Sequence, residues 1–554
     1  MRFHQLWLAL AILLAVPAWA KPAPSSGPVA HLASGAVRGR LQGDIAVFEG
    51  IPFAAPPVGP LRWREPQPVA GWSGIRDATK PSHSCIQNVN GLNTFMAPLA
   101  AAYRAAYTPE IVDQSEDCLY LNVWAPEKAA HLPVMVWVHG GSNRVGSGTE
   151  TGYDGAVLAS HGVIVVTVNY RLGIMGFFSH PELTAESPHH SSGNYALLDQ
   201  LAALKWVRQN IAQFGGDPGN VTIFGESAGS VDVMTLMTSP LSKGLFRRVI
   251  AESGPVFALG PERSLSDMAP LGEAVGKAAG GSPGSEIQTL RQMPAAQVQQ
   301  IENQLIATQF KGYYPNSPIV DGWVLPLSPA HAFASGAMQK VELIAGLNAR
   351  EMAAFRVDGE AAAKAAGKAP PEPSLSPAFA ERARTLYGDS ADKLAATYAA
   401  RIKVDGVAAL DQANNDMWAC PIGAEAALAT SAGLHAWVYR FDRSVPGPGE
   451  ADLGAFHSLE LAYVFGNFET PFFNWLPFNA TDHKLGRVIE SYWINFAKTG
   501  NPNGPGLPNW PNWNAAHEPY ISFAENGNAV PMQKFSPIYC DLSPDRLKRE
   551  LTTN

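Results

Sequence analysis

Long apolar runs mark the first half of the chain. Val134–Val138 is apolar throughout, and Val163–Val168 is interrupted only by a threonine. Apolar runs without alternation are typical of central strands that are buried on both faces of a sheet. Between residues 197 and 214 the apolar residues recur three and four positions apart, which predicts a helix. Composition and spacing predict further strands at Val37–Leu41, Ile45–Phe48, Val221–Phe224, Arg248–Ala251 and Val341–Ala345.

Strands and helical segments alternate along the chain. This order predicts an α/β protein with a large, mostly parallel twisted sheet and helices on both faces. Gly50–Gly59 is rich in proline and is predicted to be a loop, as is the stretch between Cys85 and Cys118. Met352–Ala400 is rich in alanine, proline and charge, and we interpret it as a helical insertion over the functional site. Residues 21–554 are therefore expected to form a single domain.

The first twenty residues have the pattern of an export signal. Arg2 precedes the apolar run Leu6–Val16, and Ala18-Trp19-Ala20 then supplies small residues on either side of a larger one. The apolar run is too short to cross a bilayer. We expect a cleaved signal, a mature chain that begins at Lys21, and a periplasmic or secreted protein; an uncleaved anchor is the alternative.

Composition excludes some classes of function. The chain has 554 residues, of which 46% are hydrophobic and 16% charged, and its net charge is −8. There is no basic stripe, so nucleic acid is not an expected partner. No later stretch is long and apolar enough for a stable membrane anchor. The sequence leaves the oligomeric state open.

The chain contains four cysteines, Cys85, Cys118, Cys420 and Cys540. An even number in an exported protein predicts two disulfides, and the count alone allows three pairings. Their spacing does not match a metal site, so we expect no bound metal.

The most informative motif follows the run Val221–Phe224. Gly225-Glu226-Ser227-Ala228-Gly229 has the G-x-S-x-G pattern of a nucleophile elbow, in which a serine lies on a tight turn between a strand and a helix. The glycines let neighbouring backbone come close. The alternative interpretation is a glycine-rich turn with a serine that caps the helix.

A serine nucleophile needs a histidine that accepts its proton and a carboxylate that orients the histidine. In proteins with this elbow both follow the serine in the chain. His457 stands in a polar break before an apolar run, although it could equally be a surface-loop histidine. Glu351 comes just after the strand predicted at Val341–Ala345; its alternative role is a charge at a helix N-terminus. Asp321 and Asp358 are the other acid candidates.

The developing oxyanion needs backbone N–H donors. Ala228 directly follows the candidate nucleophile and supplies one donor. The turn Gly140-Gly141-Ser142 follows a buried strand and is expected to supply the others, from Gly141 and Ser142.

Several longer segments carry a resemblance to a known family. They are Phe48–Ala54, Ser115–Val123, Asn169–Gly173, Asn194–Gln200, Phe214–Gly229, His457–Gly466 and Trp493–Pro502. They occur in the family's order, and the match extends over nearly all of the mature chain. The sequence thus resembles the type B carboxylesterase and cholinesterase family of the α/β-hydrolase fold.

The resemblance implies roles for individual residues. Ser227 would be the nucleophile, Glu351 the acid and His457 the base, with Gly141, Ser142 and Ala228 as oxyanion donors. Glu226 resembles the family's buried carboxylate beside the nucleophile, and Ser253 a supporting hydroxyl behind the triad. The resemblance also implies the disulfides Cys85–Cys118 and Cys420–Cys540, and the structural ion pairs Arg62–Glu116 and Arg171–Asp199.

The sequence departs from the family pattern in two places. Family members usually have Gly-Gly-Gly-Phe where this chain has Gly140-Gly141-Ser142-Asn143. If this backbone needs a positive φ, serine costs about 1–2 kcal/mol there. The segment between Cys85 and Cys118 also lacks the tryptophan with which cholinesterase-like members bind quaternary ammonium groups. Choline esters are therefore not expected substrates.

These observations predict an exported serine esterase that acts on small-molecule esters and needs no cofactor. One alternative is specialisation for anionic polyacid or toxin esters, because the guanidinium of Arg144 follows the oxyanion turn; the other interpretation of Arg144 is a solvent-facing side chain. The alternative from another class is a non-catalytic, cholinesterase-like binding module.

Overall fold

The structure is a computed structural model that describes residues 27–552, apart from 112, 259–262, 311–315, 371, 377–378, 381–382 and 385–386. The predicted export signal, residues 1–20, lies outside the described residues. Among the described helices, none combines the length and apolar character that a membrane span requires.

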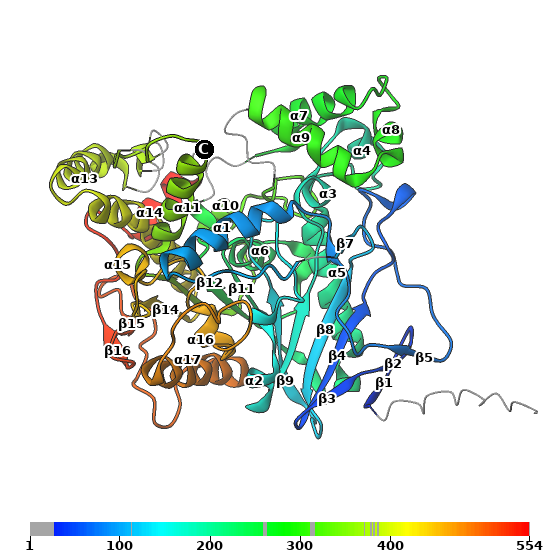
Figure 1. Cartoon of the computed structure of the whole chain (residues 1–554), viewed down its shortest axis with the longest axis horizontal. Coiled ribbons are helices and arrows are strands. Elements are labelled where there is room, and N and C mark those ends of the chain that lie inside the picture. The colour runs from blue at the N-terminus through cyan, green and yellow to red at the C-terminus, as the bar shows by residue number, and fades with distance from the viewer. Residues whose placement is uncertain are drawn as a thin grey trace, which may run out of the picture.

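An eleven-stranded sheet runs through the molecule in the order β16-β15-β14-β13-β12-β11-β9-β10-β8-β4-β3 (Figure 1). The strands from β15 to β10 in this order are parallel, and the strands at both ends are antiparallel. This is the predicted α/β fold. The bounds are β3 Arg40–Gln42, β4 Ile45–Pro52, β8 Tyr120–Pro126, β9 Leu132–Val138, β10 Ile164–Val168, β11 Gly216–Glu226, β12 Arg248–Glu252, β13 Glu342–Asn348, β14 Ala436–Phe441, β15 Tyr520–Phe523 and β16 Ala529–Met532.

Two smaller sheets and many helices complete the described fold. The small sheets are β1-β2-β5 and β6-β7, with bounds Val29–Leu32, Gly35–Arg38, Ile75–Asp77, Ser84–Cys85 and Gln114–Ser115. The longer helices are α1 Val89–Ala102, α5 Tyr195–Asn210, α6 Ala228–Leu236, α7 Leu265–Ala278, α9 Ala295–Thr308, α11 Glu351–Ala365, α13 Ala391–Asp405, α14 Val407–Ser431, α17 Ala480–Thr499 and α18 Pro544–Thr552. The shorter ones are α2 Ala156–Ser160, α3 Gly173–Phe177, α4 Pro181–Glu186, α8 Glu286–Gln292, α10 Pro329–Ser335, α15 Glu450–Leu453 and α16 Leu461–Phe465.

Most of the predicted strands and the long predicted helix are present. The apolar runs at 134 and 163 form β9 and β10, which pair in parallel at the centre of the sheet. The helix predicted at 197–214 corresponds to α5 followed by a 3-10 turn, Ile211–Phe214. Continuous apolar character therefore located the buried strands correctly.

Three local predictions are wrong. The strand expected at Val37–Leu41 is divided between β2 and β3, which belong to different sheets. β4 continues through Pro52 into the predicted loop, because a register shift after Phe48 brings Ile51 and Pro52 back into pairing with β8. The segment between Cys85 and Cys118 contains α1, where packing against α11 overrides the helix-breaking effect of Pro98.

Helices cover the edge of the sheet where the parallel strands end (Figure 1). One group, α7 to α9, was not predicted. The other group includes α11 and α13, which lie in the range where a helical insertion was expected. α1 lies between the two groups in Figure 1 and packs against α11.

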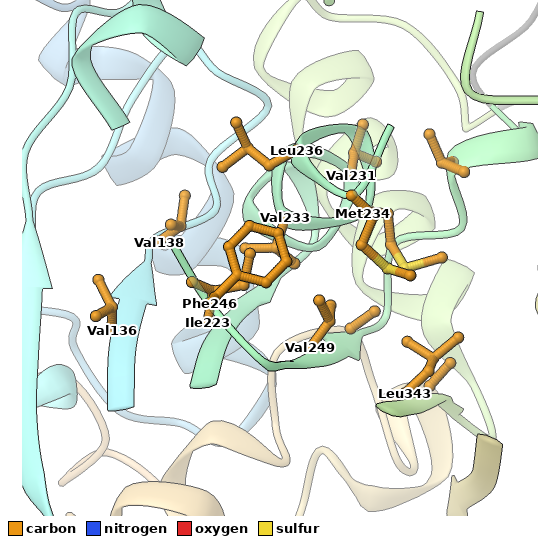
Figure 2. Packing of buried hydrophobic residues seen from close by; sticks show 14 of the residues in the cluster. Val136, Val138, Ile223, Val231, Val233, Met234, Leu236, Phe246, Val249 and Leu343 are labelled. Carbon is orange, nitrogen blue, oxygen red and sulfur yellow. The ribbon is translucent and has the colours of Figure 1, made fainter. Parts of the chain in front are cut away.

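The helix that follows the elbow packs its apolar side chains onto the sheet. Figure 2 shows Val233 and Leu236 of α6 near Val138 and Ile223 of the strands. All four are fully buried or nearly so. Burial of a side chain of this size contributes about 1.5–3 kcal/mol, so this contact fixes the position of the turn between β11 and α6.

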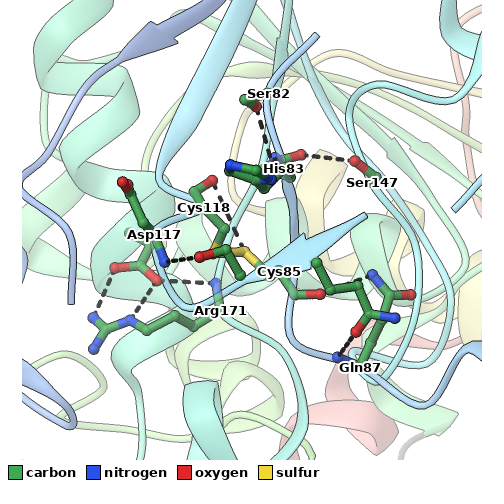
Figure 3. Close-up of a disulfide and its surroundings, with 12 residues drawn as sticks. Ser82, His83, Cys85, Gln87, Asp117, Cys118, Ser147 and Arg171 are labelled. Carbon is green, nitrogen blue, oxygen red and sulfur yellow. Dashed lines mark hydrogen bonds and ion pairs between the residues drawn. A yellow bond between two sulfur atoms is a disulfide. The ribbon is translucent and has the colours of Figure 1, made fainter. Parts of the chain in front are cut away.

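The structure forms two disulfides, Cys85–Cys118 and Cys420–Cys540, the pairing that the resemblance implies. Figure 3 shows the first one beside Arg171. Arg171 forms a buried ion pair with Asp199 at 2.7 Å, and Arg62 pairs with Glu116 at 2.6 Å. These pairs hold the loops around the first disulfide.

Candidate active site

Four neighbouring parallel strands end at one edge of the sheet, and each carries a predicted site residue just beyond its end. Ser227 follows β11, Gly140-Gly141-Ser142 follows β9, Ser253 follows β12, and Glu351 follows β13. β9, β11, β12 and β13 are adjacent in that order. The carboxyl edge of a parallel sheet is where such folds place their sites.

The backbone of Ser227 has the strained conformation of an elbow, with φ 56° and ψ −122°. At Gly225 and Gly229, which flank the turn, neighbouring backbone atoms leave no room for a side chain. A Cβ at Gly229 would lie 2.0 Å from the carbonyl oxygen of Val138, and one at Gly225 would lie 2.6 Å from the backbone of Gly229. The turn therefore holds the serine over the sheet edge, where its side chain is partly exposed.

Backbone contacts bring the loop of His457 to the end of β13. The amide of Arg350 donates to the carbonyl oxygen of Ala455 at 2.9 Å. The side-chain amide of Asn348 donates to the carbonyl oxygen of Phe456 at 2.7 Å. His457 comes next in the chain and is fixed by these two bonds.

His457 and Glu351 are in direct contact. Nδ1 of His457 lies 2.6 Å from Oε2 of Glu351, and both side chains are buried. The other oxygen of Glu351 accepts the amide of Asn348 at 2.6 Å, and the amide of Glu351 donates to Asn415 at 2.9 Å. The carboxylate is therefore held in place to orient the imidazole with Nε2 away from it.

A second carboxylate lies on the other side of the ring. Oε1 of Glu226 is 3.2 Å from Nε2 of His457 and also accepts the hydroxyl of Ser458 at 2.6 Å. Burial alone lowers the pKa of His457, but the charges of Glu226 and Glu351 outweigh it and raise the pKa above its ordinary value. Burial raises the pKa of Glu226. The site thus favours a positive charge on the imidazole.

Ser253 is linked to the surroundings of Glu351 and His457 through a third buried acid, Glu460. Its hydroxyl donates to Glu460 at 2.9 Å, and Asn348 donates to the other oxygen of Glu460. Ser253 itself has a positive φ of 51° and donates its amide to Gly346 at 2.8 Å. Ser253 therefore contacts residues that lie behind Glu351 and the loop of His457.

The predicted oxyanion turn is built from left-handed residues. Gly141 has φ 96° and Ser142 has φ 56°. Among the described residues, no acceptor takes the amide of either one. The next residue, Asn143, is anchored below the turn, because its side-chain amide donates to buried Asp232 at 3.1 Å. Ala228 begins α6, so its amide has no partner within the helix.

Ser227, His457 and the oxyanion turn line one cavity of about 400 Å³. Its apolar wall contains Phe95 and Met96 of α1 and Phe355 of α11. Arg144 also lines the cavity; its side chain is exposed and donates to Asn303 at 3.3 Å. A cavity of this volume accommodates a small organic molecule.

The structure also shows which of the three candidate acids contacts His457. Asp321 is buried away from the cavity, where it accepts the hydroxyl of Ser191 and the amides of Trp323 and Leu325. Asp358 lines the cavity from α11 but does not contact His457 in the described contacts. Glu351 is thus the carboxylate that reaches the imidazole from the end of β13.

Sequence reasoning missed several residues around the site. Trp418 and Phe355 flank the ring of His457, with ring centres 5.5 and 5.1 Å away. Ser458 and Glu460 were not singled out, although both stand next to His457 in the quoted motif. Glu302 of α9 lines the cavity and was also missed, because no recognisable motif surrounds it.

One group of residues in the described structure has ligand atoms close enough for a metal ion. The atoms of His180, Glu182 and Glu286 lie within 4.8 Å of one another. Both oxygens of Glu182 accept amides at the start of α8, from Glu286 and Ile287. Nε2 of His180 lies 2.8 Å from Oε2 of Glu286. These contacts tie α4 to α8, and we assign the group a structural role.

Comparison with known proteins agrees with this geometry. The model of the carboxylesterase family matches residues 26–537. The chain belongs to the carboxylesterase family. As a member, it is a carboxylic ester hydrolase, and the interpretation as a non-catalytic binding module is not favoured.

The relatives of this carboxylesterase include bacterial esterases. It is 39% identical over 507 residues to the fumonisin B1 esterase of Sphingopyxis macrogoltabida, which covers 87% of this chain and 84% of the relative. It is 36% identical to the para-nitrobenzyl esterase of Bacillus subtilis, over 87% of this chain and 91% of the relative. Among solved structures, a PNB esterase superposes with a TM-score of 0.76 at 31% identity, covering 95% of this chain and 99% of that one. The carboxylesterase Est55 of Geobacillus stearothermophilus superposes with a TM-score of 0.75 at 29% identity, and the match covers 95% of this chain and 100% of that one.

Proposed function

We propose that this carboxylesterase hydrolyses small-molecule esters through Ser227, His457 and Glu351. The observation that carries the proposal is the 2.6 Å contact between Nδ1 of His457 and Glu351, in the cavity that Ser227 also lines. A fixed tautomer leaves Nε2 as the basic nitrogen. A basic nitrogen beside a serine on an elbow is what ester cleavage requires.

In the proposed mechanism, Nε2 of His457 accepts the proton as Ser227 Oγ bonds to the ester carbonyl carbon. The carbonyl oxygen becomes an oxyanion and accepts hydrogen bonds from the amides of Gly141, Ser142 and Ala228. His457 then gives the proton to the leaving alcohol, and an acyl-enzyme remains. Water adds to it with the same proton transfers and releases the acid, so no metal or organic cofactor takes part.

Replacement of the nucleophile tests this proposal. Ser227→Ala is expected to lower kcat for p-nitrophenyl acetate by several orders of magnitude, because only binding and oxyanion stabilisation remain. Ser239→Ala is the control, since Ser239 is buried and bonds only the backbone in the described structure. Near-full activity in pure, folded Ser227→Ala protein would contradict the proposal.

A second, more specific candidate is an anionic ester of a polyacid or toxin. Arg144 supports it, because the guanidinium reaches the cavity and, among the described residues, forms no ion pair. The match to a fumonisin B1 esterase makes fumonisin B1 a suitable test substrate. Arg144→Ala should lower kcat/KM for anionic esters relative to matched neutral esters. An unchanged ratio would contradict this role.

We also propose that the protein is exported and that its signal is cleaved before Lys21. The support is the sequence pattern of residues 1–20 and the two disulfides, which form in oxidising compartments. Mass spectrometry of the protein from an exporting host should find Lys21 at the N-terminus. Recovery of exported protein that retains Met1 would contradict the proposal.

A further inference from the structure

The active-site cavity has an acidic wall that the proposed mechanism does not use. Glu302 of α9 and Asp358 of α11 both line the cavity, although they come from different helical groups above the sheet. Neither carboxylate takes part in the proton transfers between Ser227 and His457. Their presence in a substrate cavity therefore calls for another role.

Glu302 is buried without a direct partner. Its side chain is 6% exposed, and among the described residues no hydrogen bond or ion pair reaches its carboxylate. Burial raises the pKa of Glu302 to about 7, while the charge of Arg144 acts in the opposite direction. Burying an acid without a partner is costly, so such a group is found where a ligand supplies the partner.

Asp358 is a second acid in the cavity lining that has no hydrogen-bond partner among the described residues. Its side chain is half-buried. Burial raises its pKa. Asp358 therefore offers a second carboxylate to a cation that enters the same cavity.

Aromatic rings also line the cavity. Phe95 and Phe355 lie 5.2 Å apart between ring centres, and Phe472 and Tyr153 also line the cavity. The faces of aromatic rings attract cations. In the described lining, Arg144 is the one side chain apart from His457 that carries positive charge, and it is exposed. Carboxylates and rings together suit an organic ammonium group.

We propose that Glu302, assisted by Asp358, binds a protonated amine on the ester substrate, so that the enzyme prefers amino-substituted esters over neutral esters of the same shape. This inference rests on the proposed function of the same cavity. An ammonium N–H would donate a charge-assisted hydrogen bond to Glu302, which is stronger than a neutral one. Arg144 would weaken this preference, because its charge repels the ammonium group.

The test compares two esters that differ in one atom position. These are 2-(dimethylamino)ethyl butyrate, which is protonated, and 3-methylbutyl butyrate, which is its neutral isostere. The wild-type enzyme should have the higher kcat/KM for the amino ester at mildly alkaline pH, where Glu302 is ionised. Glu302→Gln should lower the ratio of the kcat/KM value for the amino ester to that for the neutral ester about tenfold. Glu273→Gln, on an exposed face of neighbouring α7, should change neither value.

Two further variants keep the test decisive. Arg144→Met should raise the ratio of amino to neutral ester hydrolysis, which is the opposite direction to Glu302→Gln. If Glu302→Gln were unfolded, Asp358→Asn should still lower that ratio. An unchanged ratio in folded Glu302→Gln or in Asp358→Asn would overturn the proposal. Failure of the proposed function itself would look different, because Ser227→Ala would then hydrolyse both esters normally.

Discussion

Nε2 of His457 lies 3.2 Å from Oε1 of Glu226, the residue that directly precedes the candidate nucleophile. The atom that is proposed to accept the serine proton is therefore already beside a negative charge. In the proposed mechanism, this charge stabilises the imidazolium that forms as Ser227 attacks the ester. It also raises the pKa of the free histidine, so the same contact sets the pH at which the base becomes available.

Glu226→Gln should shift the acidic limb of the pH profile of kcat/KM to lower pH. His457 must be unprotonated to act as the proposed base, and the charge of Glu226 raises its pKa. Removal of that charge lowers the pKa of His457, and the midpoint of the acidic limb follows it downward. The value of kcat should fall as well, because the imidazolium loses a stabilising charge. A limb that stays in place, or that moves upward, would contradict this role of Glu226.

Glu351→Gln should lower kcat by about three to four orders of magnitude while the fold is kept. The glutamine side chain has nearly the same shape but no longer holds the imidazole in the tautomer with a basic Nε2. Glu360→Gln is the matched control, because Glu360 lies on the same helix and its one contact among the described residues is a surface pair with Arg356 at 3.1 Å. Equal activities in the two variants would show that another carboxylate orients His457.

Ser142→Gly should raise the free energy of unfolding by about 0.5–1 kcal/mol. Relief of the positive φ at Ser142 gains about 1–2 kcal/mol, and the extra freedom of glycine in the unfolded chain removes part of that gain. Its side chain is exposed, and in the described structure it forms no hydrogen bond. The measurement is denaturant unfolding. A clear loss of stability would mean that the hydroxyl has a structural partner.

The Cys85–Cys118 disulfide closes a segment that contains α1, and α1 contributes Phe95 and Met96 to the cavity. The double variant Cys85→Ala/Cys118→Ala should lose about 2–4 kcal/mol of stability and raise KM. Removal of the other disulfide by Cys420→Ala/Cys540→Ala should lower stability but change KM less, because the described cavity lining includes no residue between 359 and 456 or after 472, so neither cysteine adjoins it in the chain. Equal effects on KM would contradict the assignment of α1 to the substrate wall.

The sequence was informative where one physical signal dominated. Unbroken apolar runs such as Val134–Val138 predicted the central strands, because a strand buried on both faces tolerates little else. The elbow around Ser227 was recognisable because close backbone contacts require glycine on both sides. The roles of His457 and Glu351, by contrast, came from the family resemblance, since neither has a local pattern that distinguishes it from a surface residue.

The rest depended on packing between distant segments. α1 contains proline and several poor helix formers, and it was predicted to be a loop; its contact with α11 stabilises the helix. Glu302 reaches the cavity only because α9 lies over the sheet edge, more than seventy residues after Ser227. No spacing rule connects these two positions, so only the structure could bring them together.

The most direct test of the central claim is the site of covalent labelling by a fluorophosphonate. Such a probe phosphonylates an activated serine, and peptide mass spectrometry then identifies the residue. We expect one label on Ser227 in the folded protein, and loss of labelling in His457→Ala and after denaturation. A label on another serine, or esterase activity that survives full modification of Ser227, would contradict it.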